Sequence, residues 1–135
     1  NKTFDAVLLD APCSATGTIR RHPDLRYVKN QANLQDLVKL QRSLLMHAAD
    51  LVRVGGKMVF CTCSLLPDEG EGQIKWFLDQ TDAFEILEPS FDGLDPDWVS
   101  AEGGVRLRPD YWPELGGMDG FYMALLQRKG DQPPV

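Results

Sequence analysis

Two short and nearly continuous apolar runs constrain the fold of this chain most. They are residues 4–10, Phe-Asp-Ala-Val-Leu-Leu-Asp, and residues 57–63, Lys-Met-Val-Phe-Cys-Thr-Cys. Runs of this length are typical of strands that are buried on both faces of a parallel sheet. Between them, apolar residues recur at helical spacing from about Asn33 to Val54, and Gly55-Gly56 is a helix stop signal. This order of strand, helix and strand predicts an α/β domain.

The second half of the chain continues this pattern. Pro67, followed by acidic residues, suits the start of a helix that runs to about Gln80. Residues 84–87 and 121–126 are apolar enough for two further strands, whereas residues 88–119 form a long loop rich in Pro, Gly and Asp. We therefore predict one α/β sheet of mainly parallel order. In such sheets ligands bind beyond the carboxyl ends of the strands.

Charge is unevenly distributed along the 135 residues, whose net charge is −6. Residues 1–60 carry nine basic and five acidic side chains, and residues 61–135 carry five basic and fifteen acidic ones. The overall acidity argues against a protein that binds polyanions without sequence preference. The basic cluster Arg20-Arg21-His22, with Arg26 and Lys29 beyond it, could hold phosphates locally or form a solvated loop. No apolar stretch is long enough to span a bilayer, so we expect no membrane association.

The three cysteines, Cys13, Cys61 and Cys63, are an odd number and lie close to apolar runs. A disulfide framework is therefore disfavoured, and a reducing, cytoplasmic location is expected. With His22 and His47 they could in principle form a zinc site. However, the Cys-x-Cys pair lies in a predicted strand rather than in a Cys-x-x-Cys turn, so we expect no metal.

Two motifs end the predicted strands, Asp10-Ala11-Pro12-Cys13 and Thr62-Cys63-Ser64. A thiolate at a strand end can act as a nucleophile, although a free cysteine is also a common small buried residue. A carboxylate at the end of an apolar strand is costly unless it is paired or used. Asp10 could accept the amino group of a nucleobase, or it could cap the loop. The residues alone leave both interpretations open.

Three motifs, taken in order, resemble a known family. Residues 10–24 begin Asp10-Ala11-Pro12-Cys13-Ser14 and end Arg20-Arg21-His22-Pro23-Asp24. Thr62-Cys63-Ser64 is followed by Pro67-Asp68-Glu69-Gly70-Glu71, and the last motif is Asp119-Gly120-Phe121-Tyr122. Over residues 4–129 the chain resembles the Nop/Sun family of RNA 5-methylcytosine methyltransferases. The resemblance implies part of a Rossmann-like methyltransferase sheet with flanking helices, and S-adenosylmethionine as cofactor.

The resemblance also implies a role for each motif residue. Cys63 would attack carbon 6 of a cytosine, and Cys13 would assist release of the methylated product. Asp10 would hold the cytosine and, with Pro12, would contact the cofactor. The substrate is expected to be RNA, in particular ribosomal RNA, with the target base drawn out of its stack. Its backbone would be held, or the loop braced, by Arg20, Arg21 and His22.

The chain departs from the family pattern at two positions and in one larger respect. Ala15 stands where the family usually has Gly, and Gly70 stands where Asn is common, which leaves Glu71 as the expected polar contact. The glycine-rich cofactor loop of the family should precede residue 1. We therefore expect residues 1–129 to form the carboxyl-terminal half of a catalytic domain, without the cofactor-binding half. Residues 130–135 are expected to form a disordered tail, and the chain alone to be inactive.

Two alternative functions remain. Asp10-Ala11-Pro12-Cys13 is loosely similar to the Asp-Pro-Pro-Tyr loop of amino-group methyltransferases, which has an aromatic residue in place of cysteine. The chain could also be a non-catalytic RNA-binding or assembly module whose aromatic side chains stack on bases. The candidates for stacking are Trp98, Tyr111, Trp112 and Tyr122. The target RNA and the oligomeric state are not determined, but an uncovered edge at the first strand would favour self-pairing.

Overall fold

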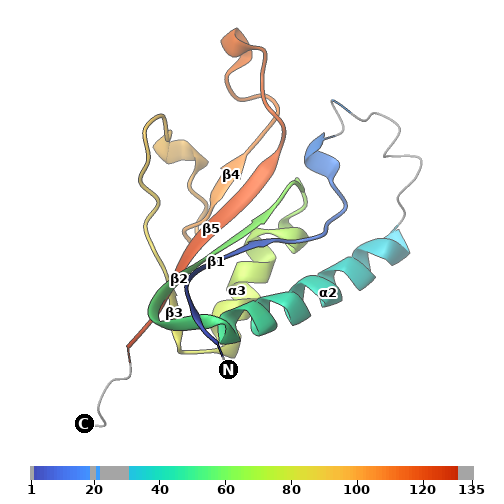
Figure 1. Ribbon diagram of the computed structural model, residues 1–135. Coiled ribbons are helices and arrows are strands. Elements are labelled where there is room, and N and C mark those ends of the chain that lie inside the picture. Colours follow the sequence, from blue (N-terminus) through green and yellow to red (C-terminus); the bar gives the residue numbers. More distant parts are fainter. Residues whose placement is uncertain (1, 19–20, 22–30, 131–135) are drawn as a thin grey trace.

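A computed structural model describes residues 2–18, 21 and 31–130 of the protein (Figure 1). The strands are β1 (Phe4–Asp10), β2 (Val52–Thr62), β3 (Phe84–Ile86), β4 (Val105–Leu107) and β5 (Phe121–Arg128). The helices are α2 (Gln31–Asp50) and α3 (Glu71–Gln80), with short 3-10 turns η1 (Thr16–Thr18), η2 (Pro67–Glu69), η3 (Pro96–Trp98) and η4 (Pro113–Leu115). Within the described ranges, no helix is both long and apolar enough to cross a membrane.

The five strands form one mixed sheet in the order β1-β2-β5-β3, with β4 also paired to β5. The expected α/β class with flanking helices is confirmed. The expectation of mainly parallel order is wrong for the strand pairs. Only β1 and β2 pair in parallel among the described strands, because β5 lies between β2 and β3 and runs antiparallel to both. The segment between β3 and β5 contains no crossover helix, which is the connection that parallel neighbours need.

The core lies between the sheet and the two helices, which cover the same face (Figure 1). Fully buried apolar side chains come from all of these elements, among them Leu45, Met58, Phe60, Phe77 and Leu126. The prediction that the first strand is buried on both faces is wrong. Leu8 is 70% exposed and Phe4 is 51% exposed. Val7 and Leu9 pack against the core, so the alternating positions Phe4 and Leu8 lie on the face of the sheet that the two helices do not cover (Figure 1).

The junction between α2 and β2 also differs from its prediction. The helix ends at Asp50, and Gly55-Gly56 lies inside β2 instead of ending the helix. Pairing with β1 shifts from Phe4 opposite Val52 to Ala6 opposite Lys57, so β2 contains extra residues at this point. Gly55 has a φ of +81°, which lets the strand bend locally at little steric cost.

The predicted helix from Pro67 is divided in two by Gly70. The turn η2 ends at Glu69, Gly70 has a φ of −137° and a ψ of −96°, and α3 begins at Glu71. Glu69, the last residue of the turn before this break, is fully buried. The long segment 88–119 contains β4 and two 3-10 turns.

Candidate active site

The two cysteine motifs meet at one edge of the sheet. Asp10 lies opposite Cys61 in the parallel pair, and the amide of Ala11 donates to the carbonyl of Cys61 at 3.0 Å. Just beyond these strand ends, the Sγ atoms of Cys13 and Cys63 are 3.5 Å apart, and both side chains are partly exposed. The fold therefore places two accessible thiols side by side where a ligand of an α/β sheet is expected.

A third segment joins this edge, because β5 runs antiparallel and therefore starts where β1 and β2 end. The amide of Gly17, after β1, donates to the carbonyl of Cys63 at 2.9 Å. The amide of Gly120, before β5, donates in turn to the carbonyl of Gly17 at 2.8 Å. The Thr16 hydroxyl accepts the amide of Leu65 at 2.8 Å. Backbone hydrogen bonds thus join all three motifs.

Glu69 is the site residue that sequence reasoning missed. Its buried carboxylate accepts hydrogen bonds from the Ser14 hydroxyl at 2.5 Å and from the Ser64 hydroxyl at 2.6 Å. The expected contact was Glu71, which instead forms an ion pair with Arg106; that arginine also donates to the Ser64 carbonyl. The available signal was a serine directly after each cysteine, since each serine needs a partner once it is buried.

Asp10 lies exposed at the end of β1, next to the buried thiol of Cys61. The Cys61 Sγ donates to the Asp10 carboxylate at 3.8 Å. Burial, and secondly the negative charge of Asp10, raise the pKa of Cys61 to about 11. Pro12 is also exposed, and its carbonyl accepts a hydrogen bond from Gln41 at 2.8 Å.

The Cys13 thiol holds its proton tightly. Burial raises the pKa of Cys13 to about 12, a hydrogen bond with the backbone of Ala15 lowers it, and the neighbouring Cys63 and Glu69 add to the increase. Cys13 is therefore a neutral thiol near pH 7. Its S–H can act as a hydrogen-bond donor to the sulfur of Cys63.

Of the expected phosphate-binding residues, only Arg21 belongs to the part of the chain that the structure describes. It donates to Asp119 at 2.6 Å, and both side chains are partly exposed. This ion pair joins the loop after β1 to the loop before β5, and contact of Arg21 with a substrate stays a prediction. Arg20 and His22 lie outside the described residues.

Two of the four aromatic residues proposed to stack on bases are buried. Trp98 is 6% exposed and packs between Tyr111, with ring centres 5.3 Å apart, and Trp112. Tyr122 is fully buried, and its hydroxyl donates to Glu102 at 2.5 Å. Only Tyr111 and Trp112 remain partly or largely exposed.

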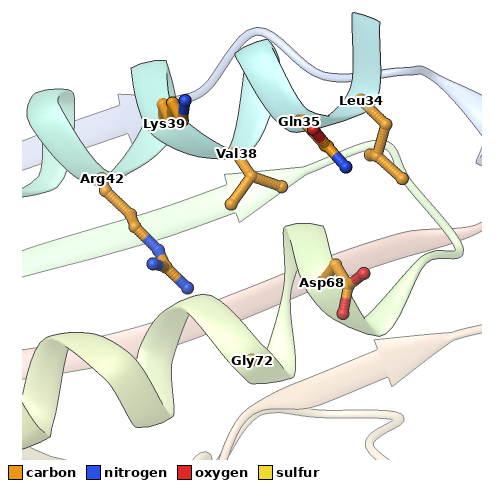
Figure 2. A pocket seen from close by; sticks show the side chains of 7 residues that line it. All are labelled: Leu34, Gln35, Val38, Lys39, Arg42, Asp68 and Gly72. Atoms are coloured by element: carbon orange, nitrogen blue, oxygen red, sulfur yellow. The ribbon is translucent and has the colours of Figure 1, made fainter. Parts of the chain in front are cut away.

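A hollow of about 620 Å³ lies beside the site, between α2 and the start of α3. Figure 2 shows Val38 and Arg42 reaching from α2 toward α3, with Asp68 across from them on η2. Neither cysteine of the pair lines it. Within the described residues, no three His, Cys, Asp or Glu side chains are grouped so that they could hold a metal ion.

Comparison with known proteins identifies the family. Residues 1–127 match the family described as 16S rRNA methyltransferase RsmB/F. The chain belongs to this family. The resemblance of its motifs to the Nop/Sun methyltransferases is thereby confirmed.

Curated members of the RsmB/F family are similar over most of this chain. The ribosomal RNA small subunit methyltransferase B of Sodalis glossinidius is 46% identical over 124 residues, which are 91% of this chain and 26% of that protein. The protein of the same name from Shewanella oneidensis is 40% identical over 123 residues, 91% of this chain and 27% of that protein. The chain thus spans about a quarter of the length of these relatives.

Solved structures confirm the Rossmann-like methyltransferase fold. The crystal structure of PH0851 superposes with a TM-score of 0.78 at 38% identity and covers 92% of this chain and 26% of that one. NSun6 from Pyrococcus horikoshii with SFG also gives a TM-score of 0.78, at 27% identity, over 96% of this chain and 31% of that one.

Proposed function

We propose that this chain carries the paired cysteines of an S-adenosylmethionine-dependent methyltransferase that modifies carbon 5 of cytosine in ribosomal RNA. The observation that carries the proposal is the 3.5 Å distance between the Sγ atoms of Cys13 and Cys63 at adjacent strand ends. Membership of the RsmB/F family, and relatives named for the small ribosomal subunit, support this substrate class.

Cys63 is the attacking thiol in this proposal. After its S–H proton has passed to solvent, its thiolate sulfur forms a bond to carbon 6 of the cytosine, and the electrons of the C5–C6 double bond move toward carbon 5 and the ring. The exposed Asp10 carboxylate accepts a hydrogen bond from the amino group or from a protonated ring nitrogen, which stabilises the electron-rich ring. Bound S-adenosylmethionine supplies the methyl group that carbon 5 accepts.

Release reverses the covalent step. The proton on carbon 5 passes to a base, the C5–C6 double bond re-forms, and the electrons of the C6–S bond return to Cys63. Because Cys13 keeps its proton near pH 7 and lies beside that sulfur, its S–H can donate to the departing thiolate. Cys13 therefore assists release by stabilising the leaving group.

Asp10 and Pro12 are the residues of this chain that we propose to contact the cofactor. Both are exposed at the end of β1, and a carboxylate suits the positive charges of S-adenosylmethionine. NSun6 from Pyrococcus horikoshii was solved with SFG, an analogue of this cofactor. We further propose that residues 1–129 act within a longer cytoplasmic protein, and that the 135-residue chain alone transfers no methyl group.

The test uses a full-length protein that contains this chain, with RNA and labelled cofactor. Cys63→Ala should abolish methyl transfer, and Cys13→Ala should accumulate a protein–RNA adduct that survives denaturation. Cys61→Ala, which removes a nearby thiol, should accumulate no adduct. Continued methylation by both Cys63→Ala and Cys13→Ala would contradict the mechanism, and a wild type that binds but never modifies RNA would favour a non-catalytic module.

The product separates this function from amino-group methylation. A methyl group on carbon 5 requires a nucleophile at carbon 6, whereas transfer to an amino group requires no thiol. The close cysteine pair therefore favours carbon 5. Mass spectrometry of nucleosides from the modified RNA should show 5-methylcytidine, and a product methylated on the amino group would contradict the proposal.

A further inference from the structure

Glu69 is a buried acid to which the proposed reaction assigns no role. Its side chain is fully buried, and its described contacts all come from donors. Oε1 accepts from the Ser14 and Ser64 hydroxyls at 2.5 and 2.6 Å. Oε2 accepts from the Ser14 amide and from Nε2 of Gln41, both at 2.9 Å. A group surrounded by donors is suited to the ionised carboxylate, which only accepts.

The two serines connect this acid to both thiols, because Ser14 directly follows Cys13 and Ser64 directly follows Cys63. A single oxygen of Glu69 thus links two loops that are 50 residues apart in sequence. We propose that Glu69 is a positioning residue whose carboxylate holds these two loops together and so sets the distance between the thiols. The inference deepens the proposed function and rests on it for its catalytic meaning.

Both helices are connected to the carboxylate. Gln41 on α2 contacts it directly, and Gln73 on α3 contacts Gln41. Nε2 of Gln41 donates to the Pro12 carbonyl and to Glu69, and because both partners are acceptors the orientation of this amide is defined. Oε1 of Gln41 accepts from Gln73 at 2.9 Å, and Gln73 accepts from Arg42 at 3.1 Å. The network therefore runs from the hollow of Figure 2, which Arg42 lines, to the cysteine loops.

The buried negative charge of Glu69 depends on its hydrogen bonds. Among the ion pairs of the described residues none involves Glu69, so its charge is balanced by hydrogen bonds alone. Such an arrangement is costly unless every bond is made, and removal of the carboxylate leaves these donors unpaired. In Glu69→Gln one carboxylate oxygen becomes an amino group. At the position of Oε2 this group would face the Ser14 amide and Nε2 of Gln41, which are both donors. At the position of Oε1 the hydroxyls of Ser14 and Ser64 would have to turn and accept from it. In either orientation the charge-assisted hydrogen bonds to both serines are lost, so this nearly isosteric variant should weaken the link between the loops.

The distance between the thiols can be measured without any methyl transfer. With Cys61→Ala as background, the chain is equilibrated with reduced and oxidised glutathione, and the fraction with a Cys13–Cys63 disulfide is determined. The two thiols lose two electrons and two protons to oxidised glutathione, which becomes two reduced molecules. The equilibrium constant reports the effective concentration of one thiol near the other.

Glu69→Gln should lower this effective concentration by roughly tenfold or more, because loops that move apart seldom bring both sulfurs into contact. Phe77→Leu is the matched control, since it weakens the fully buried core on α3 and should leave the thiol equilibrium unchanged. Ser14→Ala combined with Ser64→Ala removes both hydroxyl links and should act like Glu69→Gln, should that variant not fold. An unchanged equilibrium in a folded link variant, or an equal decrease in Phe77→Leu, would overturn the proposal.

A second measurement separates this inference from the proposed function. In the full-length protein, Glu69→Gln should lower kcat far more than it changes KM, because it displaces thiols and not the RNA-binding surface. If the thiol equilibrium falls while the wild type modifies no RNA, the positioning role stands and the proposed function fails. If methylation by Glu69→Gln equals that of the wild type, the positioning role is wrong.

Discussion

Gly17 and Gly120 meet backbone to backbone where the three motifs of the site converge. The amide of Gly120 donates to the carbonyl of Gly17 at 2.8 Å. A Cβ atom on Gly17 would lie 2.1 Å from the Gly120 carbonyl oxygen and 2.8 Å from that of Cys63. The absence of a side chain at Gly17 therefore permits the loops after β1 and β2 and before β5 to share one small volume.

Gly17→Ala should destabilise the protein by about 2–3 kcal/mol, since a methyl group there must displace backbone rather than a flexible side chain. Urea denaturation followed by circular dichroism measures this change. Gly130→Ala is the control, because the nearest atom to a Cβ at that position is 4.0 Å away. Equal stability of the two variants would show that the loops separate easily.

Ala15→Gly should stabilise the protein by about 0.5–1 kcal/mol. Ala15 has a φ of +60°, a left-handed conformation that costs an ordinary residue roughly 1–2 kcal/mol. Glycine removes this strain, but its larger entropy in the unfolded state offsets part of the gain. Thermal unfolding checks the sign. Ala101→Gly, at an exposed alanine outside the left-handed region, should be destabilising instead.

Asp10→Asn should lower the pKa of Cys61 toward its ordinary value. Burial is the larger cause of the increase and stays in place, so the pKa should remain above that value. The ultraviolet absorbance of the thiolate, titrated with Cys13 and Cys63 replaced by alanine, measures the shift. Asp5→Asn removes an exposed acid at the other end of β1 and should have no effect on this titration.

Cys13 should make the protein less stable at alkaline pH. Its pKa rises from about 9 to about 12 on folding, so the unfolded state loses the proton first and rising pH favours unfolding. This stabilisation is complete below pH 9 and is lost as the pH approaches 12. Urea unfolding at several pH values should show a flatter decline for Cys13→Ser than for the wild type, and parallel declines would contradict the shift.

Local sequence patterns were sufficient to predict those elements whose own residue types and spacing indicate their structure. The first strand covers residues 4–10 as predicted, and both cysteine motifs lie at the ends of neighbouring parallel strands. Gly55-Gly56 misled the prediction because glycine ends helices and bends strands equally well, and only pairing with β1 distinguishes the two. The position of β5 between β2 and β3 depends on long-range pairing, which no local pattern encodes.

By itself, the sequence determined the family, the strand–helix–strand order and the cysteines at the strand ends, since these depend on residue types and local spacing. Tertiary structure alone decided that the thiols lie 3.5 Å apart and that Glu69, rather than Glu71, connects their loops. The physical reason is that a buried carboxylate must find its donors wherever the fold brings them. Here those donors come from two loops and a helix that are far apart along the chain.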